Sequence, residues 1–412
     1  CNIWAQDSLQ VMFYNLYRYP SANPQNRDLL LRDIFTEYLP DLLMTCELEN
    51  EIGADAILQN SFNFSSDSFQ RAIFHYNTSD STDLLQQMVY FNTRKLTLFK
   101  QAVYPTKVRD INHYIFYLNT TNLKTDTMFL DVFVAHLKSS TGPANRQARY
   151  DMVDTFVKVL NTLPASHQVL FAGDFNFYNA NEIGYQHILD TNRTIKMVDP
   201  INAPGSWQDA VAFAAIHTQA TRTSATGFGL FGATGGLDDR FDFIMMSDGL
   251  QNDQNDLYYR DSSYVAFGNN GNCLNMRVDS IACDGPSQKN LRENLHNMSD
   301  HLPVVMTLMT KHNFGVDEPP VIDTTSLNHI HSMAGNFVIL QNSQVASQLM
   351  IRFITKVTLN TQMSIINHLG QIVAQSNIEK GTEATRLDVA ILPSGVYMVR
   401  IPGFPIQKFI KQ

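Results

Sequence analysis

The sequence predicts an α/β domain followed, after a linker, by a small all-β domain. Over residues 7–312, short apolar runs typical of buried strands alternate with segments of helical periodicity, which is the pattern of an α/β fold. After residue 326 there is no helical period, and short alternating strands follow one another. The net charge changes as well, from −13 over residues 1–325 to +4 over residues 326–412. We therefore expect two domains of different character.

In the first part, the apolar run at residues 9–16 predicts a buried strand, and the run at 42–46 predicts a second strand that leads to Glu47. Between them, apolar residues at helical spacing predict a helix over residues 27–39. Further helices are expected at 145–161 and 180–190. Further strands are expected at 86–92, 114–118, 128–136, 168–173, 241–246 and 303–309.

The second part begins after residues 313–326, where Pro319-Pro320 indicates a stiff linker. Turn signals then separate short alternating segments, which predicts a β-sandwich for residues 327–412. Its strands are expected at 349–355, 362–367, 371–375, 385–390 and 396–401.

The composition excludes several classes of protein. The chain has 412 residues, of which 44% are hydrophobic and 17% charged, so it can bury a large core. Disordered, collagen-like and disulfide-dense chains do not have this composition. No apolar run reaches the ~18 residues of a membrane span, so we expect no integral membrane segment. The net charge of −9 offers no general hold on nucleic acid, whose binding would need local Lys and Arg.

The chain start and the cysteines leave alternatives open. Residues 1–6 resemble the end of a signal peptide, with the mature chain starting near residue 6 or 7; a lipid-anchored Cys1 is the alternative. Cys273 and Cys283 form a disulfide if the compartment is oxidising, and are otherwise two free buried thiols.

The strongest candidates for chemistry follow the apolar strand that ends at Gly173. Asp174 could orient or deprotonate a water molecule, and Asn176 could donate to a developing oxyanion. An Asx turn that merely closes the strand is the structural alternative.

Two further pairs strengthen the chemical interpretation. Asp300 and His301 precede an apolar strand and offer a ligand for a hard cation and a group that exchanges protons near neutral pH. Asp242 lies within an apolar strand, where a carboxylate needs a partner. We expect that partner to be His301, because a carboxylate can fix the tautomer of a catalytic imidazole; a salt bridge to Arg240 is the alternative.

Three more polar residues end apolar strands: Glu47, Asn15 and His136. Glu47, Asn15 and Asp300 together would offer Mg²⁺ three oxygen ligands. We expect five strands to bring such groups together at their carboxyl ends.

As a set, these motifs resemble the endonuclease/exonuclease/phosphatase superfamily over about residues 9–310. The resemblance implies a four-layer α/β sandwich and Mg²⁺-dependent hydrolysis of a phosphate ester by in-line attack of water, with Mn²⁺ or Ca²⁺ as alternative ions. The motifs, in family order, are Asn15, Pro40–Glu47, His136–Ser139, Gly173–Asn176, Arg240–Ile244 and Ser299–Pro303.

The resemblance also implies roles for the individual residues. Glu47 would bind the metal with Asn15 and Asp300 close to it, Asp174 would activate the water, and Asn176 would hold a phosphoryl oxygen. His301, steered by Asp242, would stabilise the phosphorane or pass a proton, and His136 would contact the phosphate. The family often has Gln before its metal-binding Glu, whereas this chain has Cys46.

The C-terminal part has a second resemblance. Its motifs resemble the sorting domain of type IX secretion substrates, which implies a Gram-negative protein exported through the periplasm and then secreted or held at the cell surface. An adhesive or carbohydrate-binding module is the alternative. The motifs are 365–373, 387–400 and 407–411.

Three functions remain open from the sequence, and we expect a monomer in each case. The first is a secreted nuclease, whose groove Lys138, Arg146 and Arg222 would line. The second is a sphingomyelinase-like phospholipid hydrolase or small phosphate esterase, which the acidic charge and the apolar loop at 227–232 favour. The third, a non-catalytic binding or adhesion protein, is disfavoured because every expected acid is present.

Overall fold

The computed structural model of the chain describes two separate units. One lies within residues 1–321 and the other within residues 322–412. The expected signal remnant at 1–6 and most of the expected linker lie outside the described residues. These are 7–65, 67–123, 126–229, 232–315, 338–340, 344–345, 347–353, 360–367, 371–382, 384–401 and 407–411.

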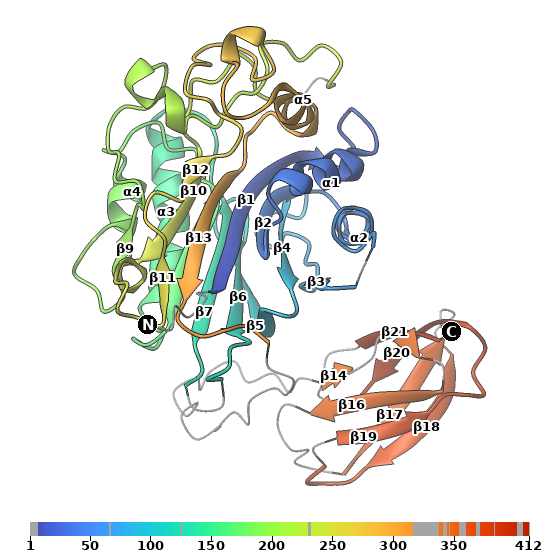
Figure 1. The fold of residues 1–412 in the computed structure, drawn as a ribbon. Helices are drawn as coiled ribbons and strands as arrows, with labels where there is room; N and C mark the ends of the chain where they lie inside the picture. Colours follow the sequence, from blue (N-terminus) through green and yellow to red (C-terminus); the bar gives the residue numbers. More distant parts are fainter. Residues whose placement is uncertain are drawn as a thin grey trace, which may run out of the picture. The chain divides into compact units, whose positions relative to one another are not determined.

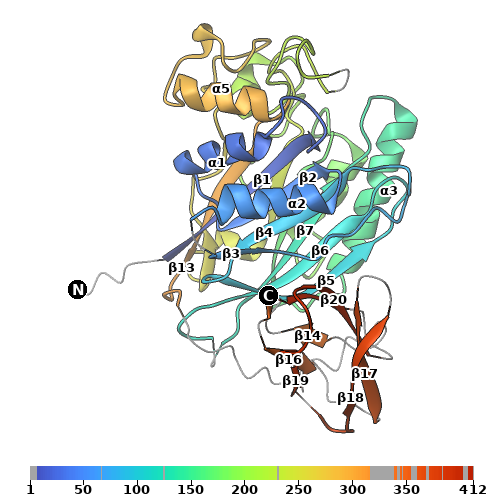
Figure 2. The ribbon, with the colours of Figure 1, turned by 90° about the vertical axis from the view of Figure 1, so that its right-hand side faces the viewer.

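The first unit contains two mixed β-sheets (Figures 1 and 2). In the first sheet the strand order is β11-β13-β1-β2-β4-β3, and β12 pairs with β13. β1 is parallel to β2 and antiparallel to β13. The strands are β1 (Asp7–Tyr19), β2 (Leu42–Leu48), β3 (Phe69–Arg71), β4 (Gln86–Asn92), β11 (Leu257–Tyr259), β12 (Val265–Ala266) and β13 (Val304–Thr310).

The second sheet has the order β5-β6-β7-β8-β10-β9. β7 and β8 are parallel, whereas β10 is antiparallel to β8. The strands are β5 (Leu96–Tyr104), β6 (Ile111–Leu118), β7 (Phe129–His136), β8 (Gln168–Asp174), β9 (Met197–Val198) and β10 (Asp242–Ser247).

The inner faces of the two sheets form one apolar core. Phe13 and Met44 of the first sheet belong to the same cluster as Val132, Ala172 and Ile244 of the second, and all five are fully buried. Burial of apolar side chains is the main source of stability in such a sandwich, because each Å² of apolar surface removed from water contributes roughly 25 cal/mol.

Helices cover the outer faces. α1 (Arg27–Glu37) and α2 (Glu51–Ala56) lie over the first sheet, as Figure 2 shows, and α5 (Lys289–Met298) packs against α1. α3 (Pro143–Leu160) and α4 (Ile183–Ile188) cover the second sheet through a separate apolar cluster. The predicted four-layer α/β sandwich is confirmed.

The second unit is all-β, as predicted. A three-stranded sheet has the order β14-β16-β19, and a five-stranded sheet has the order β15-β21-β20-β17-β18. Leu349, Ile365 and Phe409 are among the residues of their shared core. The strands are β14 (Val338–Leu340), β15 (Gln344–Val345), β16 (Gln348–Phe353), β17 (Thr361–Asn367), β18 (Ile372–Ile378), β19 (Ala384–Asp388), β20 (Gly395–Arg400) and β21 (Gln407–Lys411).

A disulfide joins Cys273 and Cys283, which settles the two alternatives left open by the sequence, and Cys46 is a buried free thiol. Within the described part of the chain, no helix combines the length and the apolar character that crossing a membrane requires.

A buried carboxylate on β7, Asp131, contributes to the stability of the second sheet in a way that depends on pH. Asp131 is fully buried, and its two oxygens bind His113 Nε2 and His167 Nδ1, both at 2.6 Å. Burial opposes ionisation of Asp131, but these two hydrogen bonds prevail and lower its pKa. A carboxyl group whose pKa is lower in the folded state stabilises the fold above its unfolded pKa of about 4, and this contribution is lost as the pH falls through the folded value.

We expect Asp131→Asn to lower the free energy of unfolding by about 1–3 kcal/mol at pH 7. The difference from the wild type should shrink as the pH falls below about 4, because the wild-type carboxyl then loses its ionised form too. Urea denaturation at pH 7 and pH 3 measures both values. An equal difference at the two pH values would contradict the assignment.

Candidate active site

The candidate residues of the second sheet meet at one edge. His136 ends β7 in register with Asp174, which ends the parallel strand β8. Asp242 is also in register with Asp174, but it opens β10. The expectation that all groups arrive at carboxyl ends is therefore wrong for Asp242. Because β10 runs antiparallel to β8, its start lies at the same edge.

The first sheet brings its residues to this edge in a similar way. Asn15 is in register with Cys46, next to Glu47 in β2, at a point where the register between β1 and β2 shifts. Asp300 and His301 precede β13 instead of ending a strand, and β13 is antiparallel to β1. Each sheet therefore contributes about half of the site.

Glu47 is held by two donors. Asn15 Nδ2 donates to its Oε1 at 3.0 Å, and the backbone N–H of Arg18 donates to its Oε2 at 3.1 Å. Burial, and then the charge of Asp300, raise the pKa of Glu47. A carboxylate in such surroundings is stabilised by a cation.

Asn15 acts as a donor between the acids. Besides Glu47, its Nδ2 donates to Asp174 Oδ2 at 3.1 Å, whereas its Oδ1 accepts from the backbone N–H of Tyr17 at 2.9 Å. In this orientation its oxygen is engaged by the backbone, so the side chain bridges carboxylates and does not add a third free oxygen to Glu47 and Asp300. The predicted role of Asn15 as a nearby metal ligand is therefore the weakest of the three.

Asp174 and Asn176 form one hydrogen-bonded turn. The backbone N–H and the Nδ2 of Asn176 donate to Asp174 Oδ1 at 3.2 and 2.8 Å, and Asn176 has a positive φ of 52°. The Asx turn that the sequence allowed is thus present, and it does not exclude chemistry. Burial, with the charges of Asp242 and Glu47, raises the pKa of Asp174 to about 8, although His301 opposes the shift. A raised pKa makes a carboxylate a stronger base.

His301 is fixed from both ring nitrogens. Its Nδ1 lies 2.7 Å from Asp242 Oδ2, and its Nε2 lies 2.5 Å from Gln219 Nε2 and 3.7 Å from Asp174 Oδ2. Burial opposes the imidazolium form, but the carboxylates of Asp242 and Asp174 prevail and raise the pKa of His301 well above its usual value. Arg240, the alternative partner of Asp242, binds Asp199 with both terminal nitrogens instead.

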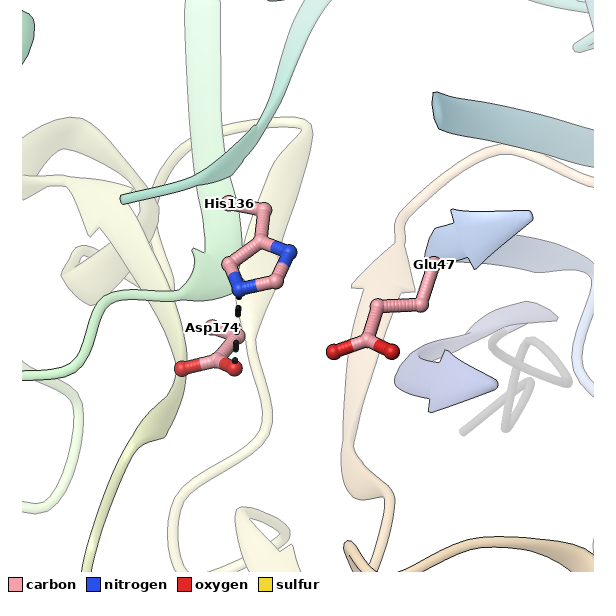
Figure 3. Close-up of side chains that lie close together, drawn as sticks. All are labelled: Glu47, His136 and Asp174. Carbon is pink, nitrogen blue, oxygen red and sulfur yellow. Dashed lines mark ion pairs between the residues drawn. The ribbon is translucent and has the colours of Figure 1, made fainter. Parts of the chain in front are cut away.

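The donor set suits a hard divalent cation. Glu47, His136 and Asp174 offer ligand atoms that all lie within 4.8 Å of one another, and Figure 3 shows their side chains pointing toward one another. Asp300 accepts from the backbone N–H of Ala233 at Oδ2, but its buried Oδ1 has no hydrogen-bond partner in the described part of the chain. An orphaned buried carboxylate oxygen beside further carboxylates is chemistry that a cation would satisfy.

His136 faces the same group of acids. Its Nε2 lies 3.5 Å from Asp174 Oδ2, and its Nδ1 is buried with no partner among the residues described. Burial, and then the charge of Arg109, lower the pKa of His136 well below its usual value. The ring is therefore neutral at physiological pH and can donate one hydrogen bond without adding charge.

The three predicted substrate cations have different positions. Lys138 is half-buried and its Nζ donates to Ser139 O at 3.1 Å, and Arg146 is exposed on α3. The position of Arg222 contradicts the prediction that it lines a substrate groove, because only 1% of the residue is exposed. Its guanidinium lies against the rings of Phe228 and Tyr17, and its Nε donates to His296 O. The apolar loop expected at 227–232 can be judged only in part, because residues 230 and 231 lie outside the described residues.

Sequence reasoning missed two residues of this edge. Gln219 contacts His301, but it follows no strand and belongs to no motif, so nothing in the sequence marks it. Arg109 has a side chain that is 12% exposed and lies 2.7 Å from Asp83, and its charge acts on both Glu47 and His136. The strand predicted at 114–118 starts at Ile111 in the structure, two residues after Arg109. The sequence could have suggested Arg109 only if this earlier start had been known.

Comparison with solved structures finds similar folds at low identity. A TDP2 from D. rerio, complexed with single-strand DNA product, is 14% identical, with 73% of this chain and 99% of that chain covered and a TM-score of 0.47. The human Nocturnin catalytic domain with bound sulfate is 16% identical, with 75% and 98% covered and a TM-score of 0.45. An endonuclease/exonuclease/phosphatase from Beutenbergia cavernae is 11% identical, with 98% and 99% covered and a TM-score of 0.45.

No curated protein matches the chain. A family model does match its C-terminal part, where the structure has the all-β unit. Residues 345–411 of this chain match the family described as the secretion system C-terminal sorting domain.

Proposed function

We propose that the protein is an exported, metal-dependent phosphoesterase that hydrolyses phosphodiester bonds of nucleic acid. The observation that carries the proposal is the convergence of Asp174, Glu47 and the Asp242–His301 pair at one edge of the sandwich. The acids, the amide and the imidazoles that hydrolysis of a phosphate ester requires are all present there.

Each residue of the candidate site has its own role in the proposed hydrolysis. Asp174 orients a water molecule and accepts its proton as the water oxygen bonds to phosphorus. Asn176 and the neutral His136 donate hydrogen bonds to phosphoryl oxygens. His301, held by Asp242, stabilises the negative charge that develops as the ester bond breaks, and can pass a proton to the leaving oxygen.

A divalent ion would be held by Glu47 with Asp300. Mg²⁺ is the ion that this oxygen-rich set fits best, with Mn²⁺ or Ca²⁺ as alternatives. When bound, it would supply Lewis-acid stabilisation of the charge on the phosphoryl group.

Nucleic acid is favoured as the substrate by the cations Lys138 and Arg146, which follow β7 along the chain, whereas the charge of Arg109 is paired with Asp83. Phospholipid or a small phosphate ester is the second candidate, because the chain is acidic overall. Insertion of the loop at 227–232 into a lipid surface has less support, since Phe228 is half-buried against Arg222 and His296.

The sorting domain at residues 345–411 supports export. We infer that it addresses the protein to a type IX secretion system of a Gram-negative bacterium, so that the enzyme acts outside the cell or at its surface. We expect it to act as a monomer.

The test is nicking of supercoiled plasmid by the full chain with Mg²⁺ and with EDTA. We expect nicking with Mg²⁺ and at least a hundredfold slower nicking with EDTA, because the acids alone leave the phosphoryl charge without its cation. Hydrolysis of sphingomyelin or of a small phosphate ester, without nicking, would overturn the nuclease and support the second candidate. No metal-dependent hydrolysis of any of these esters by the folded chain would overturn the phosphoesterase itself.

A further inference from the structure

A pocket of about 320 Å³ is lined by α3 and by residues of the segment 179–183, which follows the candidate residues Asp174 and Asn176 along the chain. One wall comes from the start of α3 and the other from the segment that follows Asn176 along the chain. The residues that matter for its chemistry are Arg146 and Gln147 on α3 and Asn179, Asn181 and Glu182 on the opposite wall.

The pocket and the active site share one rigid frame. Arg149, fully buried, donates from Nε to Glu182 Oε2 and from Nη1 to the backbone oxygens of Lys138 and Ser140, at 2.8–2.9 Å. The loop after β7, to which Lys138 and Ser140 belong, also accepts a hydrogen bond from the catalytic candidate Asn176, whose Nδ2 lies 3.4 Å from Leu137 O. The loop after β7, the segment after β8 and α3 are therefore fixed to one another.

The charge balance inside the pocket is positive. Glu182 is neutralised by Arg149 and also accepts from the backbone N–H of Tyr178 at 2.9 Å. Gln147 is engaged by Asp151 at 2.8 Å. Arg146 makes no side-chain hydrogen bond or ion pair with any residue that the structure describes. A free guanidinium beside amide side chains is suited to a phosphate group.

We propose that this pocket, called here the Arg146 pocket, binds a second phosphate of the substrate, next along the strand from the ester that is cut. The inference rests on the proposed function and deepens it, because it makes the substrate a nucleic-acid strand with a phosphate on one particular side of the scissile bond. A small molecule with two phosphates has the same chemistry, so the test separates the two sources.

The test measures binding instead of turnover. The full chain carrying Asp174→Asn is titrated calorimetrically, with Mg²⁺, with the thymidine dinucleotide TpT and with its 5′-phosphorylated and 3′-phosphorylated forms. We expect one of the two phosphorylated forms to bind about tenfold more tightly than TpT, as a charged hydrogen-bonded pair allows. Adding Arg146→Ala should remove that difference. Lys158→Ala, an equal charge change at the far end of α3, should leave it intact.

Each other outcome overturns the proposal. If neither phosphorylated dinucleotide binds more tightly than TpT, or if the tighter binding persists with Arg146→Ala, the pocket binds no second phosphate. Inositol 1,4-bisphosphate is titrated in the same way. If its binding depends on Arg146 and the binding of the phosphorylated dinucleotides does not, the pocket binds a small polyphosphate and not a nucleic-acid strand. Because no cleavage is needed, a failure of the proposed function in the plasmid assay remains distinguishable from a failure here.

Discussion

Asp174→Asn is expected to lower the rate of metal-dependent hydrolysis by about 10³-fold while the protein stays folded. The substitution keeps the shape of the side chain and removes the base. It also removes a buried charge that lies close to the charges of Asp242 and Glu47, both of which raise the pKa of Asp174. The fold should therefore lose little stability, and the effect should be confined to turnover. Initial rates of plasmid nicking and a thermal unfolding curve, on the same preparation, measure the two.

A matched substitution elsewhere controls for the change of charge. Asp253 is exposed, so Asp253→Asn changes the net charge equally and should leave the rate within twofold. If the Asp174→Asn variant retained more than a tenth of the wild-type rate, Asp174 would not be the base, and the convergence of groups at this edge would need another explanation.

Much of the fold could be predicted because its periodicities are strong. α3 occupies Pro143–Leu160 where residues 145–161 were expected, and β8 and β10 match their apolar runs to within a residue or two. Other elements gave weaker signals. α2 is a helix of six residues, too short to show a period, and most of β5 is half-exposed instead of alternating between buried and exposed positions. α5 was missed although Leu291, Leu295 and Met298 have helical spacing.

The candidate site could be predicted for a different reason. A polar residue at the end of a buried strand, such as Asp174 or His136, must reach either water or a partner, so it stands out in an apolar sequence. Contacts made by loops have no such signal. Gln219 reaches His301 only because the backbone of residues 218–221 hydrogen-bonds both to Asp239 and to the segment at 300–302. Arg222 was misassigned because sequence cannot show that aromatic rings enclose a guanidinium.

Asp242→Asn is expected to lower kcat by about 10²–10⁴-fold with a smaller change in KM. In the wild type, Asp242 Oδ2 lies 2.7 Å from His301 Nδ1, which keeps a proton on that nitrogen and leaves Nε2 facing the site. A carboxamide can present its N–H to Nδ1, which reverses the tautomer, and it cannot stabilise an imidazolium. Because it also removes a cause of the raised pKa of His301, the loss should fall on the chemical step. Steady-state kinetics and ¹⁵N chemical shifts of His301 measure the rate and the tautomer.

The second sheet contains its own control for this substitution. Asp131 is also fully buried and hydrogen-bonded to histidines, but it lies on β7 five residues before His136, paired in register with Val169 and away from the edge where the site forms. Asp131→Asn should lower stability and leave kcat nearly unchanged, whereas Asp242→Asn should lower kcat. Equal kcat values for the two folded variants would show that a buried Asp–His pair in this sheet is structural wherever it occurs, and would remove His301 from the proposed chemistry.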